Sequence, residues 1–427
     1  MDKKLKLLIF CEPKSVHSVR WINQLRDTGW KVKVASPVAP NWNFWTTNHI
    51  SPQNNAISAE IAPVELVQSK IGVLFQLCAF FGKVIMFFCK KTKIKNPNLD
   101  GFYNRLISNY WRSELSKLIN DFQPDIVHSL AINQDWRNLC LPVLELKQNG
   151  KIKSPWIYSS WGTDLTFYPD LDVKFKREVE RIIRSVDYYI SECKRDYDQA
   201  VLFGLQGKYL GSLPAFGGIH TTEMKVYRSQ GKVSERRKIY IKGRGEEDPV
   251  GMAMEIMNAL EANHDLLKGY EILIGQATPS IINKSVDLKE HFGLNIKILP
   301  FMKNPDDILK FVGNSRVFAS YTKNDGLPAS LTESMVLGAF PIFSKLLSIE
   351  EWITSGENGF LVDVEDPKEL AAYLKQALLD DALVDKAAEI NLNIIEQKMD
   401  YQKIKSQVIS IYQKVAEENG NPVGMVS

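Results

Sequence analysis

The sequence contains 427 residues, which is more than one hydrophobic core normally serves, so two domains are expected. Its formal net charge of +3 is too small to indicate a nucleic-acid partner, and its 44% hydrophobic content is ordinary for a globular protein. The five cysteines are scattered and form no Cys-x-x-Cys pair, which fits a reducing compartment and argues against a disulfide framework or a structural zinc site.

The first half of the chain alternates apolar runs with helical patterns. The run at residues 7–10 ends before Glu12 and Pro13, so it is too short for a signal-peptide core and predicts a buried first strand of a cytoplasmic protein. The strand LKLLIF is followed by the helical pattern VHSVRWINQLRDTG. Further strands are predicted at KVKVAS, DIVHSL, SPWIYSS and VDYYIS.

Residues 71–95, IGVLFQLCAFFGKVIMFFCKKTKIK, are apolar on almost every side of a helix up to Cys89 and then carry four lysines. Lys83 would cost about 3 kcal/mol at the centre of a membrane-spanning helix, so spanning is not favoured. A helix that docks on anionic lipid fits better, since each basic residue contributes about 1 kcal/mol there. This interpretation predicts a protein peripheral to the inner face of the cytoplasmic membrane. A buried helix of the N-terminal domain is the alternative.

The second half repeats the alternation, with predicted strands KIYIKG, YEILIG, IKILPF, RVFASY, AFPIFS and GFLVD. Strands that alternate with helices indicate parallel sheets covered on both faces, and two such series indicate two doubly wound α/β domains. The Gly- and Pro-rich residues 213–225 predict the boundary, so that the domains span residues 1–218 and 219–398. Residues 399–427 form a C-terminal helix and tail that we expect to pack back on the N-terminal domain.

The stretch NDGLPASLTESMVLGAFPIFS, residues 324–344, holds two carboxylates, Asp325 and Glu333, around a Gly-Leu-Pro turn. RVFASY should be a strand, KNDGLP the loop at its carboxyl end and PASLTESMVLG the next helix, with Gly338 just past its end. Parallel sheets bind ligands at the carboxyl ends of their strands, and a helix N-terminus offers free N–H groups to an anion. The pattern therefore predicts a site for a polyhydroxylated nucleotide conjugate.

This stretch resembles the donor-binding signature of the retaining glycosyltransferases of family 4, in which two Glu residues are separated by seven residues and Gly-Leu-Pro follows the first. The resemblance extends to SGENGFLVDVEDPKELAAYLKQALLD at residues 355–380. It extends in a supporting way to the segments LLIFCEPKSVHSVRWINQLRDTGWKVKVAS, PDIVHSL, SSWGTDL and SECKRDYDQAVLFGLQGKYLGSLPAFGGI. It implies the GT-B fold, in which two Rossmann-like doubly wound domains face a central cleft.

The resemblance also assigns roles to residues of the second domain. The family's second acidic residue holds the ribose, which points to Glu333, and its first contacts the donor sugar, which points to Asp325. Lys242 and Arg244, at the end of KIYIKGRG, are the candidates that neutralise the diphosphate, and such cations stabilise a departing pyrophosphate. The other donor-binding candidates are Gly326, Leu327, Pro328, Ser330 and Thr332.

Each of these residues also has an alternative role that involves no ligand. Glu333 could lie on a solvated helix face, Asp325 could form an Asx turn, and Lys242 and Arg244 could be surface charges at a strand end. The chain also departs from the family pattern at three positions. Asp325 stands in place of Glu, Pro249 and Val250 occupy the place of a lysine, and Trp161 occupies the place of a histidine. Lys242 is the candidate substitute for the missing lysine.

The N-terminal half supplies candidates for the acceptor side. His17, which we group with Asp325, Lys242 and Arg244 as catalytic, could touch the donor phosphate or the acceptor, or it could be a surface histidine. His128 either faces the acceptor or is buried and hydrogen-bonded. Asp164 either binds an acceptor hydroxyl or caps the next helix. Trp161 can stack on a sugar.

Two further groups of charges lie in the N-terminal half. Arg195 and Asp196, in CKRDYD, are expected to form structural contacts or a wall on the acceptor side. The sequence DLD at residues 170–172 resembles a metal-binding Asp-x-Asp motif, but its surroundings are wrong for that fold, so no metal site is predicted. The histidines show no metal-ligand spacing such as His-Glu-x-x-His.

The predicted function is transfer of a sugar from a nucleotide-sugar donor, expected to be UDP-linked, to a hydroxyl of a glycan or lipid-linked acceptor in surface polysaccharide assembly. The resemblance implies retention of configuration without a metal ion, and no cofactor besides the nucleotide-sugar substrate. An epimerase on the same fold and a non-catalytic glycosyltransferase-like subunit are the alternatives. Turnover of the donor distinguishes all three.

Overall fold

The computed structural model describes residues 4–11, 15–35, 64–66, 115–132, 140–300, 302 and 304–421. The chain divides into two compact units. The first unit comprises Met1–Ser191, Ala200–Gly211 and Val408–Ser427, and the second comprises Glu192–Gln199 and Ser212–Gln407. The apolar segment at residues 71–95 lies outside the described residues, so its proposed membrane docking remains a prediction.

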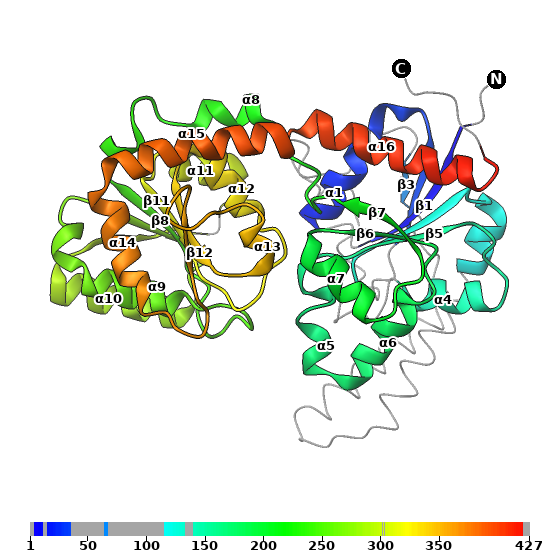
Figure 1. The fold of residues 1–427 in the computed structure, drawn as a ribbon, viewed down its shortest axis with the longest axis horizontal. Coiled ribbons are helices and arrows are strands. Elements are labelled where there is room, and N and C mark those ends of the chain that lie inside the picture. Colours follow the sequence, from blue (N-terminus) through cyan, green and yellow to red (C-terminus); the bar gives the residue numbers. More distant parts are fainter. Residues whose placement is uncertain are drawn as a thin grey trace. The chain divides into compact units, whose positions relative to one another are not determined.

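The first unit is built on a seven-stranded sheet of order β3-β2-β1-β4-β5-β6-β7 (Figure 1). Its strands are β1 (Lys6–Phe10), β2 (Lys31–Ala35), β3 (Val64–Leu66), β4 (Ile126–Leu130), β5 (Trp156–Ser159), β6 (Tyr188–Ser191) and β7 (Lys208–Ser212). All pairs from β3 to β6 are parallel. Every residue of β4, β5 and β6 is buried, as expected for parallel strands covered on both faces.

The helices associated with this sheet are α1 (Val16–Asn23), α4 (Leu141–Gln148), α5 (Tyr168–Leu171), α6 (Val173–Ile183), α7 (Lys194–Leu202) and α16 (Tyr401–Glu418). The first residues of α7 and of α16 belong to the second unit. In α6, the buried residues Phe175, Val179 and Ile182 recur at helical spacing. Asp172, from the DLD sequence, caps this helix because its carboxylate accepts hydrogen bonds from the first backbone N–H groups.

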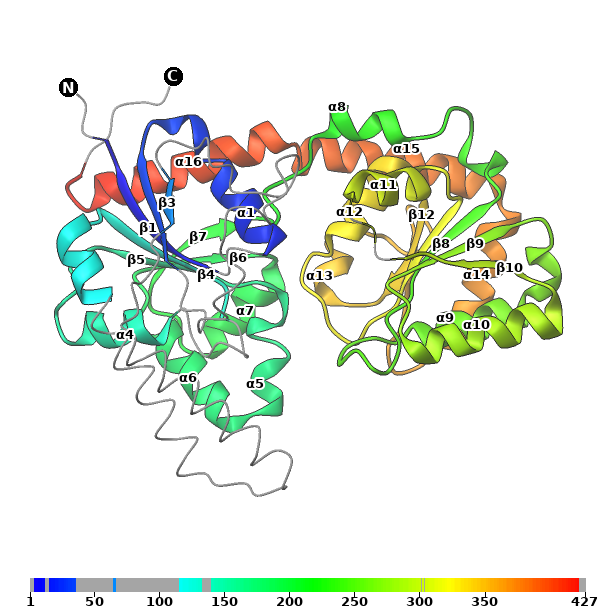
Figure 2. The same ribbon diagram turned by 180° about the vertical axis from the view of Figure 1, so that it is seen from behind.

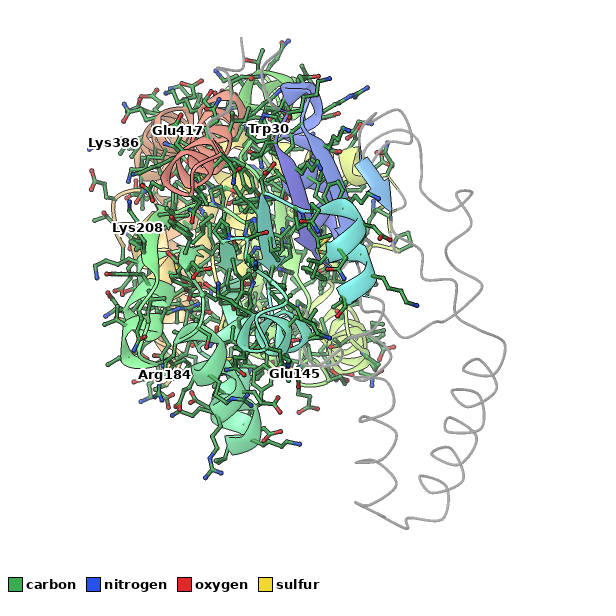
Figure 3. The ribbon with its side chains drawn as sticks, turned by 90° about the vertical axis from the view of Figure 1, so that its right-hand side faces the viewer. Trp30, Glu145, Arg184, Lys208, Lys386 and Glu417 are labelled. Atoms are coloured by element: carbon green, nitrogen blue, oxygen red, sulfur yellow. The ribbon has the colours of Figure 1, made fainter. Side chains whose placement is uncertain are left out.

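The end of α16 is joined to the first unit through Tyr412. The Tyr412 hydroxyl accepts a hydrogen bond from Trp21 Nε1 at 3.1 Å and lies 2.7 Å from His128 Nδ1. Its ring packs edge-to-face against Trp30, with 6.0 Å between the ring centroids. Figure 3 labels Trp30, which directly precedes β2, and Lys208, the first residue of β7. Near the end of the helix, Glu418 pairs with Lys208 of β7. A buried aromatic cluster and a surface ion pair therefore fix these turns of α16.

The second unit is built on a six-stranded parallel sheet of order β10-β9-β8-β11-β12-β13. Its strands are β8 (Lys238–Lys242), β9 (Glu271–Gly275), β10 (Asn295–Ile298), β11 (Val317–Ser320), β12 (Phe340–Ser344) and β13 (Phe360–Val362). Its helices are α8 (Thr221–Met224), α9 (Ala253–Ala262), α10 (Pro279–Phe292), α11 (Pro305–Gly313), α12 (Ala329–Leu337), α13 (Leu347–Glu350), α14 (Glu369–Leu379) and α15 (Asp381–Lys398).

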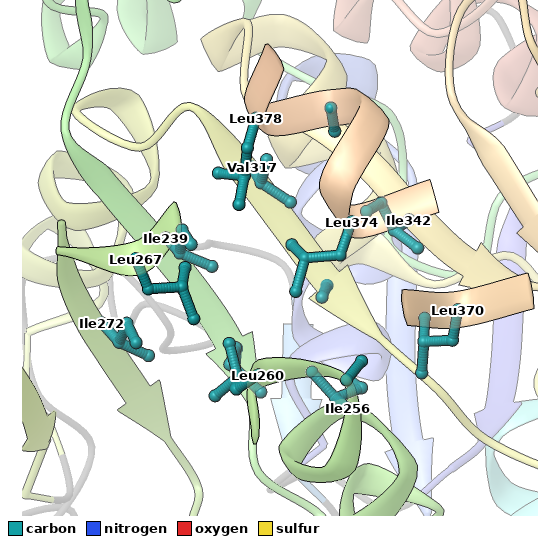
Figure 4. Packing of buried hydrophobic residues seen from close by; sticks show 14 of the residues in the cluster. Ile239, Ile256, Leu260, Leu267, Ile272, Val317, Ile342, Leu370, Leu374 and Leu378 are labelled. Atoms are coloured by element: carbon teal, nitrogen blue, oxygen red, sulfur yellow. The ribbon is translucent and has the colours of Figure 1, made fainter. Parts of the chain in front are cut away.

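Two hydrophobic cores lie on the two faces of this sheet. Helices α9, α10 and α14 cover one face, and α11 and α12 lie over the other (Figure 2). On the first face, Ile239 and Val317 of neighbouring strands pack with Leu260 of α9 and Leu374 of α14 (Figure 4). The sheet is therefore held between two apolar layers, and its strand ends are the places where polar side chains can gather.

Every strand predicted from the sequence is present, and the predicted C-terminal helix within residues 399–427 spans Tyr401–Glu418. Strands β3 and β7 were not predicted. The division into units differs from the predicted boundary, because the second unit begins at Ser212 and also includes Glu192–Gln199. Among the helices of the described residues, none is both long enough and apolar enough to cross a membrane.

Candidate functional site

The candidate site of the second unit begins where two neighbouring strands end. Strands β8 and β11 pair in parallel, with Val317 opposite Ile239. Their carboxyl ends therefore lie at the same edge of the sheet, and the loops that follow them start side by side. Lys242 is the last residue of β8, and Asp325 follows β11. The fold thus brings together residues that the sequence separates widely.

The two loops are also bonded to each other. Lys323 N donates a hydrogen bond to the Val250 carbonyl at 2.8 Å, and Met252 N donates to the Tyr321 carbonyl at 3.0 Å. Between these bonds lies Gly251, where an added Cβ would approach the Arg244 carbonyl oxygen to 2.4 Å. Only glycine fits this close approach. The loop that carries Arg244 and the loop that leads to Asp325 are therefore held as one structure.

Arg244 is oriented by a carboxylate that the sequence did not single out. Asp248 receives hydrogen bonds from Arg244 Nε at 2.7 Å and from Nη2 at 2.9 Å, and its Oδ1 also accepts from Val250 N at 3.1 Å. Burial acts to raise the pKa of Asp248, but the hydrogen bonds from Arg244 and Val250 outweigh it and the pKa is lowered. The pair is therefore ionised, and it fixes the guanidinium in one orientation.

Lys242 lies within electrostatic reach of the other candidates. Burial lowers its pKa, the neighbouring Arg244 lowers it further, and the carboxylates of Asp325 and Glu333 act in the opposite direction. Glu333 also acts on Tyr240, whose pKa is raised to about 12 by burial and by that carboxylate. Arg244 and three carboxylates, those of Asp325, Glu333 and Asp248, therefore lie close enough to Lys242 to influence its ionisation.

Helix α12 carries Glu333 and starts at this cluster. Its N-cap is Pro328, which offers no side-chain cap, and its C-cap is Gly338 with a positive φ of 82°, as predicted. The hydroxyl of Thr332 is turned back onto the Ala329 carbonyl at 2.9 Å. Ser330 Oγ is buried and has no hydrogen-bond partner among the residues that the structure describes. The first turn of α12 thus offers N–H groups and one hydroxyl to a ligand.

The loop before α12 is held by side chains from elsewhere in the unit. The Asp325 carbonyl accepts hydrogen bonds from Arg195 Nη1 at 2.7 Å and from Ser348 Oγ at 2.9 Å. The Glu192 carboxyl group is hydrogen-bonded to the backbone of Leu327. The Leu327 side chain is part of the hydrophobic core, so only its backbone can contribute to a site. Gly326 is buried between these two held positions.

Glu192 and Ser348 were missed by sequence analysis. Glu192 directly follows β6, and the carboxyl end of a parallel strand is the signal that could have drawn attention to it. Its pKa is raised well above the usual range by burial and by the nearby carboxylates of Asp196 and Asp325. Nothing in the sequence around Ser348 marks it.

In the first unit, His128 is buried and hydrogen-bonded, which was the second of its two predicted alternatives. It is completely buried, Nδ1 lies 2.7 Å from the Tyr412 hydroxyl and Nε2 lies 2.8 Å from Ser159 Oγ. Burial lowers its pKa to about 3, so the ring is neutral. Since both ring nitrogens are engaged inside the protein, this position offers no contact to an acceptor.

Asp164 organises the loop that contains Trp161. Its Oδ2 accepts hydrogen bonds from Ile132 N at 2.8 Å, Trp161 N at 3.0 Å and the Tyr158 hydroxyl at 3.0 Å. Gly162 in this loop has a φ of 52°, a conformation that favours glycine. The carboxylate therefore supports the loop that contains Trp161, and the N-cap of the next helix, α5, is Phe167.

His17 and Trp161 are brought together by the fold of the first unit. His17 is the second residue of α1, and its ring meets the Trp161 ring edge-to-face with 5.7 Å between centroids. Both side chains are partly buried. Their catalytic and acceptor-side roles remain predictions.

Residues 283–396 match the family model described as glycosyl transferases group 1. This match covers less than half of the chain and includes α12 with Glu333, so it supports a group 1 glycosyltransferase. No curated protein sequence shows a significant match to the chain.

Solved structures resemble the chain over nearly its whole length. Anabaena HepE, solved in complex with UDP and glucose, is 15% identical, with a TM-score of 0.63 and coverage of 96% of this chain and 100% of the other. Sucrose-phosphate synthase from Thermosynechococcus elongatus is 12% identical, with a TM-score of 0.66 and coverage of 97% and 100%. A UDP-forming alpha,alpha-trehalose-phosphate synthase from Burkholderia xenovorans is 12% identical, with a TM-score of 0.66 and coverage of 96% and 99%. The chain has the GT-B fold.

Proposed function

We propose that the protein is a retaining glycosyltransferase that moves a sugar from a UDP-linked donor to a hydroxyl of a glycan or lipid-linked acceptor. The observation that carries the proposal is the cluster of Lys242, Arg244, Asp325 and Glu333 at the carboxyl ends of β8 and β11. Two findings support it: the segment that contains Glu333 matches the family model, and a structural neighbour was solved in complex with UDP.

Each side chain has a distinct part in donor binding. Glu333 accepts hydrogen bonds from the ribose hydroxyls, and Asp325 accepts hydrogen bonds from hydroxyls of the donor sugar. The first turn of α12, with its uncapped N–H groups and the Ser330 hydroxyl, receives the phosphate that joins nucleotide and sugar. Lys242 and Arg244 balance the charge of the diphosphate.

Bond cleavage places negative charge on the departing UDP. Cations that are already oriented stabilise this charge without having to reorganise. Such preorganised electrostatic stabilisation is usually the largest single contribution to catalysis. Asp248 provides that orientation for Arg244. The leaving phosphate takes up the proton of the acceptor hydroxyl, so the protein supplies position and electrostatics in place of a strong general base.

The acceptor side of the proposal rests on residues 71–95 and on two residues of the first unit. A lipid-linked acceptor and a location at the inner face of the cytoplasmic membrane follow from the apolar and lysine-rich residues 71–95. Trp161 and His17 are the candidates that contact the acceptor in the first unit. Assembly of a surface polysaccharide is the pathway class that such an acceptor indicates.

The test measures the melting temperature of the wild type and of Glu333→Ala. Each protein is measured with UDP, GDP, ADP or CDP, and with the glucose conjugate of each nucleotide. A nucleotide at about 100 times its dissociation constant stabilises a protein by about 2.7 kcal/mol. We expect UDP and UDP-glucose to raise the melting temperature of the wild type and to lose this effect in Glu333→Ala. Glu357→Ala is the matched control, since Glu357 is an exposed carboxylate of the same unit.

Two outcomes would contradict the proposal. Absence of stabilisation by every nucleotide would favour a non-catalytic subunit. Conversion of the donor to another sugar nucleotide, without UDP release, would favour an epimerase.

A further inference from the structure

The segment Glu192–Gln199 belongs to the second unit, although it directly follows the last residues of β6 in the first. It contains a buried ion pair: Arg195 Nε and Nη2 both donate to Asp196 Oδ1, at 3.0 and 2.8 Å. The Asp196 side chain is completely buried and that of Arg195 is 12% exposed. A pair of charges removed from water in this way costs free energy unless further hydrogen bonds compensate.

The third guanidinium nitrogen of Arg195 reaches the loop around Gly326. Its Nη1 donates to the Asp325 carbonyl at 2.7 Å and lies 3.5 Å from Asn324 Oδ1. Asp196, by fixing the guanidinium, fixes the direction of this bond as well. The backbone just before Gly326 is therefore attached to a rigid charged group.

The backbone just after Gly326 is attached to the same segment. The Glu192 carboxyl group is hydrogen-bonded to the backbone of Leu327 and of Ala215, and the residue is 8% exposed. One segment thus holds the loop on both sides of Gly326, at Asp325 and at Leu327. The Asp325 side chain projects from the residue whose carbonyl Arg195 holds, next to the part of the loop between these two attachments.

We propose that Glu192 and Arg195 are positioning residues for sugar transfer, which hold the backbone around Gly326 so that the Asp325 carboxylate keeps a fixed place relative to Lys242. The inference rests on the proposed function. Glu192, Asp196 and Asp325 also lie within electrostatic reach of one another, so the attachment affects the charge around the Asp325 carboxylate as well as the backbone that carries it. Arg195 contributes a positive charge to this group, and its bond to Asp325 is made to the backbone carbonyl.

The consequence is a kinetic signature that separates positioning from folding. Displacement of a reacting group by about 1 Å can cost about a hundredfold in rate. Glu333, which we place on the ribose, is on α12 and is not attached to Arg195 or Glu192 by any of these bonds. Loss of the attachments should therefore lower kcat and leave nucleotide affinity nearly unchanged.

The experiment measures UDP release from UDP-glucose, together with stabilisation by UDP, in matched variants. Glu192→Leu removes the acceptor for the Leu327 and Ala215 backbones, whereas Glu192→Gln keeps an acceptor of the same size. The double variant R195M/D196N removes the ion pair without leaving one charge buried alone. Lys194→Met is the control: it removes a neighbouring positive charge whose side chain pairs with Asp198 on the helix surface.

We expect kcat to fall about 10- to 100-fold in Glu192→Leu and in R195M/D196N, with UDP stabilisation equal to that of the wild type. Glu192→Gln and Lys194→Met should remain within about threefold of the wild type. If Glu192→Leu does not fold, the double variant and the recovery in Glu192→Gln decide the question.

Three results would overturn the inference. Wild-type kcat in both disruptive variants would show that the attachments do not position Asp325. Parallel loss of UDP stabilisation and kcat would show a general structural role. A wild type that neither binds UDP nor releases it from UDP-glucose would remove the proposed function and the inference together, whereas the first two results leave that function standing.

Discussion

Each unit contains a cluster of polar side chains, and the two clusters differ in burial and in charge. The His128 cluster of the first unit consists of Trp21, His128, Ser159 and Tyr412. The Lys242 cluster of the second unit consists of Lys242, Arg244, Asp325 and Glu333. The first contains only neutral groups, since burial lowers the pKa of His128 to about 3. The second contains charges of both signs.

The difference shows what each cluster is built for. In the His128 cluster, each ring nitrogen of His128 meets a hydroxyl, which is how protein interiors normally satisfy buried polar groups. In the Lys242 cluster, a desolvated ammonium group stays close to two carboxylates and a guanidinium. Charges that are gathered at strand ends with perturbed pKa values are typical of functional sites. The fully buried, neutral cluster therefore suits a rigid interior, whereas the partly buried, charged cluster is the one that we propose binds the donor.

The largest expected effect is loss of catalysis on removal of the Lys242 charge. Lys242→Met should lower kcat for UDP release about 100- to 1000-fold, the usual effect of removing one group that stabilises transition-state charge. Lys238→Met is the control, because Lys238 begins the same strand and pairs with Glu271 at 2.8 Å. A kcat within about threefold of the wild type would show that the cluster is not catalytic.

The His128 cluster should instead respond to pH through stability. His128 has a pKa of 6.5 when unfolded and about 3 when folded. Because the folded value is the lower one, its contribution to stability is fully present above pH 6.5 and is lost as the pH falls toward 3. At pH 4.5 the loss should be about 2.7 kcal/mol, at 1.36 kcal/mol per pH unit below the unfolded pKa.

The measurement is urea unfolding at pH 7 and pH 4.5, followed by tryptophan fluorescence, for the wild type and His128→Gln. The variant should lose about 2.7 kcal/mol less than the wild type between these two pH values. His291→Gln, which changes an exposed histidine, should keep the wild-type pH dependence. Equal pH dependence in His128→Gln and the wild type would mean that His128 is charged in the folded protein.

A smaller loss of stability is expected in Tyr412→Phe. The change leaves Trp21 Nε1 and His128 Nδ1 without their hydroxyl partner, and buried polar groups left in this way cost about 2 kcal/mol in total. The free energy of unfolding is measured by urea denaturation. Ser406→Ala removes an exposed hydroxyl from the same helix and should have little effect. Stabilisation by UDP should be unchanged in Tyr412→Phe, and its loss would contradict the separation between the two clusters.

The sequence predicted the elements whose signals are local. Apolar runs marked every strand of the two sheets except β3 and β7, and the turn around Gly326 marked Asp325 and Glu333. Strand β7 was missed because most of its residues are only partly buried, so it lacks a continuous apolar run. Strand β3 has only three residues, which is too short for a periodic pattern.

The contacts within both clusters were beyond sequence analysis because they join distant parts of the chain. Arg195 and Asp325 are 130 positions apart, and His128 and Tyr412 are 284 positions apart. No local pattern reports such a pairing. The choice between an acceptor-side and a buried His128 was therefore open in the sequence, and the packing of α16 decided it.

The smallest expected effect tests how the Lys242 cluster is oriented. Asp248→Asn keeps the size of the side chain that holds Arg244, but removes the charge that aligns both guanidinium hydrogen bonds. If Asp248 aims Arg244 at the diphosphate, the donor KM should rise about tenfold, equivalent to about 1.4 kcal/mol. Asp265→Asn is the control, because Asp265 is an exposed partner of Lys268 on the surface. A lower KM in Asp248→Asn would reverse the interpretation, because Asp248 would then compete with the diphosphate for Arg244, and Lys242 would remain as the principal cation of the cluster.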